Sequence, residues 1–159
     1  MQLSTLPMEE LMPILSAQLE SGGRATLVVT GNSMYPTFRN RVDAVYLTPV
    51  KRPLKRGDLI LYRRENGQYI LHRIVSKPKN GKFFCTGDNQ WELEPVADAQ
   101  VLALVDGFVR DGKTCPEGDR RYRAWVVLWV WLRPVRRPIL SVGKAVGRFR
   151  RKLKRRRSL

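Results

Sequence analysis

The chain has 159 residues, of which 43% are apolar, and this suffices for one domain with its own hydrophobic core. Its two cysteines, Cys85 and Cys115, exclude a disulfide framework, and with a single histidine they offer no zinc-ligand spacing, so we expect no metal and no cofactor. Residues 1–119 hold 15 Lys or Arg and 14 acidic residues, whereas residues 120–159 hold 15 Lys or Arg and no acidic residue. We therefore expect a near-neutral domain over residues 1–119, followed by a basic tail over residues 120–159.

The first predicted element is a helix over residues 6–20, where leucines recur at helical spacing before a Gly-Gly pair. From Arg24 onward, short β-branched and apolar runs predict strands instead. Asn-Gly pairs at 66–67 and 80–81 lie between such runs and are a strong hairpin signal. The sequence thus predicts a mainly β fold, an antiparallel sheet or partial barrel with its core over residues 24–110. The predicted strands are Ala25–Thr30, Val42–Thr48, Asp58–Arg63, Gln68–Val75, Lys82–Thr86 and Val101–Val109.

The tail is predicted to be helical. Its apolar run Ala124–Leu132 has nine residues, far fewer than the roughly 20 that span a bilayer, so we expect no transmembrane helix. The first residues of the chain show no signal peptide. From Ile139 to Leu153 apolar residues form a stripe with Lys and Arg beside it, as in a basic amphipathic helix. Two interpretations stay open: residues 122–159 bind an anionic membrane surface, or the apolar run packs on the sheet.

Three short segments hold a serine, the single histidine and an aspartate, in that order along the chain. Ser33 lies in a Gly-Asn-Ser turn after a predicted strand, His72 is the single histidine, and Asp88 follows a glycine. A serine hydroxyl becomes a nucleophile when a base takes its proton, and an acidic group fixes the tautomer of that base. Taken singly, these residues also fit a turn serine, a core histidine and a turn aspartate. Together they are candidate catalytic residues, and the candidate oxyanion-hole or substrate-binding residues are Gly31, Asn32, Met34, Pro36 and Asn89.

The order and local sequence of these segments resemble the type I signal peptidases and the related LexA-like self-cleaving repressors. Their nucleophile motif, Ser-Met-x-Pro-Thr, is matched by residues 33–37, and Arg-Gly-Asp at the start of a strand by residues 56–58. The histidine-base branch, of the endoplasmic-reticulum and archaeal type, carries His-Arg and a later Gly-Asp-Asn, matched by residues 72–73 and 87–89. The resemblance covers residues 24 to about 105. It implies a signal-peptidase-like fold and serine endopeptidase activity, in which the serine attacks and the histidine is the base.

The match departs from the family at the oxyanion hole and at the acid. Position 31 is glycine where many signal peptidases have Ser or Thr, so the hole is expected to rest on backbone amides around Ser33. The histidine branch often has a further aspartate shortly after Gly-Asp-Asn, whereas the acidic residues nearby in this chain are Glu92 and Glu94, which are the alternatives to Asp88. A Ser-Lys dyad is the alternative to His72, and its candidate lysines are Lys51, Lys55 and Lys77.

The expected function is that of a serine endopeptidase that cleaves a peptide or precursor protein. No membrane anchor is visible, so we expect it in the cytoplasm, with peripheral binding to the inner membrane face as a further expectation. The alternatives are a non-catalytic peptide-binding or regulatory module on the same fold and, ranked last, a nucleic-acid binder through the basic tail. With an ordinary histidine as base, activity is expected to fall on acidification through about pH 6.5.

Overall fold

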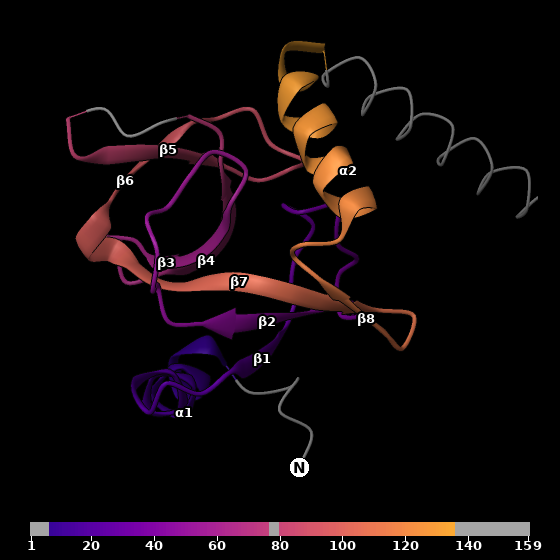
Figure 1. Ribbon diagram of the computed structural model, residues 1–159. Coiled ribbons are helices and arrows are strands. Elements are labelled where there is room, and N and C mark those ends of the chain that lie inside the picture. The colour runs from indigo at the N-terminus through magenta and orange to yellow at the C-terminus, as the bar shows by residue number, and fades with distance from the viewer. Residues whose placement is uncertain (1–6, 77–79, 136–159) are drawn as a thin grey trace, which may run out of the picture.

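The computed structural model describes residues 7–76 and 80–135, and Figure 1 shows their arrangement. Two helices, α1 (Met8–Glu20) and α2 (Arg120–Trp131), flank one mainly β body. Short 3-10 turns lie at Asp98–Gln100 and Arg133–Val135. The prediction of a mainly β, antiparallel fold is confirmed. The strands are β1 (Ala25–Val28), β2 (Ala44–Thr48), β3 (Leu59–Arg63), β4 (Tyr69–Ile74), β5 (Lys82–Thr86), β6 (Glu94–Ala97), β7 (Val101–Arg110) and β8 (Lys113–Pro116).

All neighbouring strands are antiparallel, in the order β1-β2-β7-β3-β4-β5-β6, and β8 pairs with β7. The long strand β7 holds the sheet together because it pairs with β2, β3 and β8. In Figure 1 the β3–β6 part curls away from the layer formed by β1, β2 and β7, and α1 covers the other side of that layer. The register shifts once in β2–β7 and once in β3–β7, and such bulges increase the local bend of a sheet.

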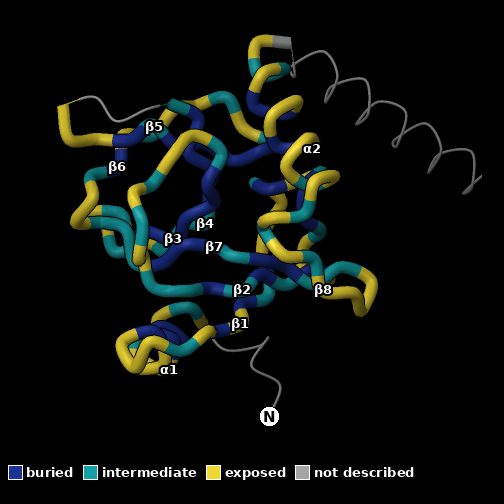
Figure 2. The backbone as a smooth tube through the Cα atoms, in the orientation of Figure 1, coloured by how far each residue is buried: buried dark blue, intermediate teal, exposed yellow. Residues whose placement is uncertain are grey.

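Burial on both faces of β3 divides the interior into two cores. Leu59 and Leu61 face a core shared with α1, β1, β2 and β7. Ile60 and Tyr62 face a second core inside the curled part of the sheet. Because successive side chains of a strand point to opposite faces, a strand buried in this way must lie between two packed layers. Figure 2 shows the result as dark stretches through the middle of the strands and exposed residues on the outer side of α1.

The predicted helix and six predicted strands correspond to α1, β1–β5 and β7, with ends that differ by a few residues. At the predicted hairpin turn 80–81, Asn80 and Gly81 both have positive φ (52° and 70°), as a tight hairpin turn requires. The sequence did not predict β6 or β8. Each has four residues, and each contains a proline, Pro95 or Pro116, which removes one backbone donor from the ladder.

Helix α2 packs on the β body. Its N-terminus is capped by Asp119, whose carboxylate accepts from the Tyr122 amide at 2.9 Å. Val126 and Val130 are buried against Val75, so this part of the apolar run belongs to the interior. No helix among residues 7–76 and 80–135 is long and apolar enough to cross a membrane. The predicted amphipathic stripe from 139 to 153 lies outside the described residues.

Candidate active site

The loop that carries Ser33 follows β1 and is held in a tight turn by its own polar groups. Gly31 has φ +81°, a left-handed conformation that glycine adopts without steric cost, and its amide donates to Asn40 Oδ1 at 2.9 Å. The Tyr35 amide donates to the Asn32 carbonyl at 3.2 Å, which closes the turn around Ser33. Ser33 itself is half-buried, and within the described residues its hydroxyl makes no hydrogen bond. The position of Ser33 is thus fixed by hydrogen bonds of the surrounding loop and not by a hydrogen bond of its own hydroxyl.

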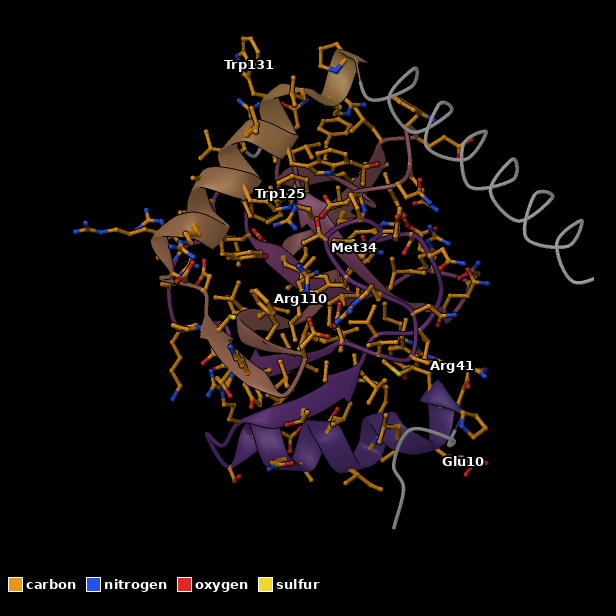
Figure 3. The ribbon with its side chains drawn as sticks, turned by 90° about the vertical axis from the view of Figure 1, so that its right-hand side faces the viewer. Glu10, Met34, Arg41, Arg110, Trp125 and Trp131 are labelled. Atoms are coloured by element: carbon orange, nitrogen blue, oxygen red, sulfur yellow. The ribbon has the colours of Figure 1, made fainter. Side chains whose placement is uncertain are left out.

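The backbone amides at this turn are candidate donors to a negatively charged oxygen. Among residues 7–76 and 80–135, the N–H groups of Ser33 and Met34 have no acceptor. The Met34 side chain is only 1% exposed and anchors the loop in the core that Leu59 and Leu61 face. Figure 3 shows Met34 in the interior of the molecule. Pro36 follows half-buried, with a cis bond to Tyr35. Two neighbouring amides without an acceptor, on an anchored turn, are candidate donors of an oxyanion hole.

The loop with Asp88 is fastened directly to the Ser33 loop. The Asn89 amide donates to the Ser33 carbonyl at 2.7 Å, and Asn89 Nδ2 donates to the Asn32 carbonyl at 3.0 Å. A Cβ built on Gly87 would lie 2.6 Å from the Ser33 carbonyl oxygen and 3.1 Å from His72 Nε2. Ser33 and His72 therefore flank the same glycine, and both line one cavity of about 270 Å³.

We expect Gly87→Ala to lower the free energy of unfolding by about 1–3 kcal/mol, because the new methyl group presses on a backbone carbonyl that cannot rotate away. Urea unfolding measures the effect. Gly118→Ala is the matched control, because a Cβ there meets nothing within 4 Å. Wild-type stability in Gly87→Ala would contradict the close approach of the three segments.

His72 lies on β4 with its two ring nitrogens in different surroundings. Nδ1 is 3.3 Å from the Tyr62 hydroxyl, and that hydroxyl donates to Glu94 Oε2 at 2.7 Å. Because the single hydroxyl proton goes to Glu94, the geometry assigns a proton to Nδ1, which donates to the Tyr62 oxygen. Nε2, beside Gly87, is then the unprotonated nitrogen. It is therefore the ring nitrogen that is available as a proton acceptor.

Glu94 is fixed in turn by Arg64, whose Nε and Nη2 donate to its two carboxylate oxygens at 2.5 and 2.6 Å. These hydrogen bonds hold the pKa of Glu94 below its ordinary value, against the opposing effect of burial. Burial lowers the pKa of His72 to about 4, although the negative charges of Glu94 and Asp88 act in the opposite direction. Burial and the hydrogen bond to Glu94 raise the pKa of Tyr62. At neutral pH the group is therefore a neutral imidazole, a protonated tyrosine and an ionised glutamate.

Asp88 forms a buried ion pair. Its Oδ1 accepts from Arg73 Nε at 3.0 Å, and its Oδ2 accepts from Arg73 Nη2 at 2.8 Å and from the Thr37 hydroxyl at 2.5 Å. The side chains of Arg73 and Asp88 are fully buried. The geometry thus connects Nδ1 of His72 to Glu94 through Tyr62, while the Asp88 carboxylate binds Arg73 and Thr37. Orientation of His72 by Asp88 stays a prediction.

The same ion pair explains the spacing of the sequence motifs. Arg73 Nη1 also donates to the Gly57 carbonyl at 3.0 Å. Thr37 ends the Ser-Met-x-Pro-Thr segment, Gly57 is the centre of Arg-Gly-Asp, Arg73 follows the histidine, and Asp88 is the centre of Gly-Asp-Asn. One member of each of four separate segments thus meets at a single buried cluster. This cluster, Thr37, Gly57, Arg73 and Asp88, fixes the loops on which Ser33 and His72 depend, and we refer to it as the buried clamp.

Helix α2 closes over the buried clamp. Trp125 Nε1 donates to the Thr37 hydroxyl at 3.1 Å, and Trp129 Nε1 donates to the Asp88 carbonyl at 3.2 Å. The two indole rings stack, with centroids 4.9 Å apart. Figure 3 shows Trp125 pointing from the helix toward the body of the protein. The helix is therefore part of the structure that supports the site.

Two of the lysines that are alternative candidate bases, and the buried thiol of Cys85, are placed away from Ser33. Lys51 and Lys55 are exposed, and no lysine is among the described residues that line the cavity with Ser33. Lys77 lies outside the described residues. Cys85 is buried in the second core, and burial raises the pKa of its thiol to about 12, as expected for a packing residue.

Sequence reasoning missed Tyr62 and Arg64. In the β3–β4 hairpin Ile60 pairs with His72 and Tyr62 pairs with Ile70, which makes Tyr62 a diagonal neighbour of His72 on the same face. The strand alternation together with the Asn-Gly turn was the signal that could have found it. No protein-family model and no curated protein matches this chain.

Proposed function

We propose that this chain is a serine endopeptidase of the signal-peptidase-like superfamily. One observation carries the proposal: Ser33 and a neutral histidine, His72, line the same cavity. Nε2 of this histidine lies on the side of Gly87 that also faces the Ser33 carbonyl. The sequence resemblance to the histidine-base branch supports the same assignment, and the buried clamp gives a physical reason for the four spaced motifs.

The proposed reaction has two steps. Ser33 Oγ attacks the carbonyl carbon of the scissile peptide bond while its proton passes to His72 Nε2, and the amides of Ser33 and Met34 bind the oxyanion. The imidazolium, stabilised through Tyr62 by Glu94, gives the proton to the leaving amine as the C–N bond breaks. Water, deprotonated by the same nitrogen, then hydrolyses the ester on Ser33 and regenerates the hydroxyl.

The shape of the cavity favours an extended peptide. Four consecutive residues from each of two segments, 27–30 and 69–72, line it. Because alternate residues of a strand point to opposite faces, consecutive lining residues mean that the backbone edge faces the cavity. In the described part of the chain, Tyr69–Leu71 pairs with β3 on one side and with no strand on the other, since β5 pairs only at Arg73 and Ile74. A substrate strand can add to this edge and place its carbonyl at Ser33.

The side chains that line the cavity favour a substrate with an apolar residue next to the scissile bond. Leu27 and Leu61 come from the sheet, and Met8 and Leu11 come from α1. An apolar substrate side chain in this space gains roughly 25 cal/mol for each Å² of surface removed from water. Arg64, which also lines the cavity, has its guanidinium held by Glu94.

A mixture of peptides of diverse sequence, incubated with the full chain and followed by mass spectrometry, tests the proposed function. We expect new termini that cluster at bonds beside apolar residues and that disappear in Ser33→Ala. Peptides that bind but are never cleaved would favour the non-catalytic module instead. Cleavage that persists unchanged in Ser33→Ala would exclude Ser33 as the nucleophile.

The depressed pKa of His72 changes the expected pH dependence. A base with the ordinary pKa of about 6.5 would be mostly protonated at pH 5, and the cleavage rate would fall about 25-fold from its value at pH 7. With a pKa of about 4, His72 stays unprotonated at pH 5, so we expect a rate within about twofold of that at pH 7. Because the chain has one histidine, NMR of its imidazole gives the pKa without assignment.

Acidification should also weaken the fold through this group. The unfolded chain takes up a proton near pH 6.5, whereas folded His72 resists it until about pH 4, so stability declines across that window by about 3 kcal/mol. Circular dichroism at each pH shows whether a lower cleavage rate comes from protonation of His72 or from unfolding of the protein. A histidine that titrates near pH 6.5 in the folded protein would contradict the buried, neutral base.

A further inference from the structure

We infer that the outward side of α2 docks onto the surface of an anionic membrane. Ala124, Val127, Leu128 and Trp131 follow the spacing i, i+3, i+4, i+7 and form one side of the helix, which we refer to as the outer face. Val127 is 71% exposed, Leu128 49% and Trp131 73%. This inference goes beyond the proposed peptidase activity and does not depend on it.

The outer face is not needed for packing. The opposite side of the helix already packs on the body, through Val126 and Val130 and through the indoles that bond to Thr37 and Asp88. Figure 3 shows Trp131 pointing away from the body at the end of the helix, whereas Trp125 points inward. A helix that is apolar on two sides has one side left for a partner, because a contiguous apolar patch in water is unfavourable and marks an interaction surface.

The surrounding charge selects an anionic lipid surface as that partner. Arg120, Arg121 and Arg123 are exposed in the first turn of α2, and residues 120–159 contain no acidic side chain. Tryptophan favours the interface between headgroups and acyl chains, and each Lys or Arg near an anionic leaflet adds about 1 kcal/mol of attraction. A second copy of the chain would bring the arginines of two helices together, and nucleic acid would not need the exposed Val, Leu and Trp.

The length of the helix fixes how it would lie. Its 12 residues are too few to span a bilayer, so it would rest in the plane of the interface with its outer face in the headgroup region. Because the inner side of the same helix bonds to Thr37 and Asp88, docking would hold these loops within about 10 Å of the lipid surface, the diameter of one helix.

Vesicle binding of the full chain tests the inference. We expect the protein to sediment with vesicles of phosphatidylcholine and phosphatidylglycerol and to bind vesicles of phosphatidylcholine alone far more weakly. The double variant Val127→Ser, Leu128→Ser should lower the partition coefficient at least about tenfold, because two apolar side chains leave the interface. On binding, tryptophan emission should shift to shorter wavelength, and the shift should be smaller in Trp131→Phe.

A matched control uses equally exposed apolar residues elsewhere. Val42 is 62% exposed and Ile14 49%, so the double variant Ile14→Ser, Val42→Ser removes similar side chains from other surfaces. Ile14 lies on α1, and Figure 3 shows Arg41, the neighbour of Val42, far from Trp131. This control should bind vesicles like the wild type. Wild-type vesicle binding by Val127→Ser, Leu128→Ser would overturn the inference, as would dimers that this variant abolishes or a preference for DNA over anionic vesicles at physiological salt.

Discussion

Replacing Asp88 by asparagine is expected to lower the free energy of unfolding by about 3–5 kcal/mol. Asparagine keeps the size of the side chain but removes the charge that compensates Arg73, and both side chains are fully buried. A buried guanidinium left without its carboxylate costs far more than a lost surface contact. Asparagine has one acceptor oxygen instead of two, so it cannot accept from Arg73 Nε, Arg73 Nη2 and the Thr37 hydroxyl together, and the loop of Ser33 is held less firmly. Urea unfolding followed by tryptophan fluorescence measures the change.

Asp106→Asn is the matched control for this prediction. Asp106 also pairs with an arginine, Arg24, at 2.7 Å, but both side chains are substantially exposed. An exposed pair contributes about 0–1 kcal/mol, so the control should unfold close to the wild type. The double variant Arg73→Met, Asp88→Asn should lose less than the sum of its single variants, because neither charge is then buried alone. An Asp88→Asn protein as stable as Asp106→Asn would show that the buried clamp does not hold the fold.

Tyr62→Phe is expected to slow peptide cleavage about 100-fold or more while the protein stays folded. Phenylalanine fills the same space in the second core but removes the oxygen that faces His72 Nδ1 and the hydroxyl that donates to Glu94. Without that oxygen the proton of the imidazole is no longer directed to Nδ1, and Nε2 is no longer reliably the free base. General base catalysis contributes about 10²–10⁴-fold, and loss of the correct tautomer removes much of it.

Two comparisons show whether Tyr62 positions the base or only packs. Tyr46→Phe removes a surface hydroxyl that lies 3.3 Å from Thr114 Oγ1, and it should leave cleavage unchanged. NMR of the imidazole nitrogens should show the proton on Nδ1 in the wild type and a changed tautomer population in Tyr62→Phe, which a packing role alone would not produce. Wild-type kcat in Tyr62→Phe, with a large loss of kcat at unchanged stability in Asp88→Asn, would return the orienting role to Asp88.

Much of the fold was predictable from local sequence signals, because alternating apolar strands and Asn-Gly turns act over a few residues. The strands that escaped prediction depend on their partners. In β6, Glu94 and Pro95 have low strand propensity, and the pairing of Val96 with Phe83 places this segment at the sheet edge. For β8, the pair Asp111-Gly112, with φ of 50° and 75°, was a hairpin signal that the sequence did contain.

The sequence indicated the candidate residues of the site but not the side chains with which they interact. Ser33 and His72 were singled out, and the structure places them at one cavity. The local sequence around Asp88 does not reveal that its charge lies against Arg73, because the two meet only when β4 and the loop after β5 pack together. The pKa of His72 was equally hidden, since it depends on burial by the whole fold and not on neighbours in the chain.

Covalent trapping of the nucleophile tests the central claim most directly. A peptidyl phosphonate with an apolar residue next to the phosphorus reacts with a serine whose proton is taken by a base, and intact and peptide mass spectrometry locate the adduct. We expect one adduct on Ser33 in the wild type, formed at a rate that falls at least about 100-fold in His72→Ala. An adduct on another serine, or equal labelling of Ser33 in the wild type and in His72→Ala, would contradict the Ser33–His72 mechanism.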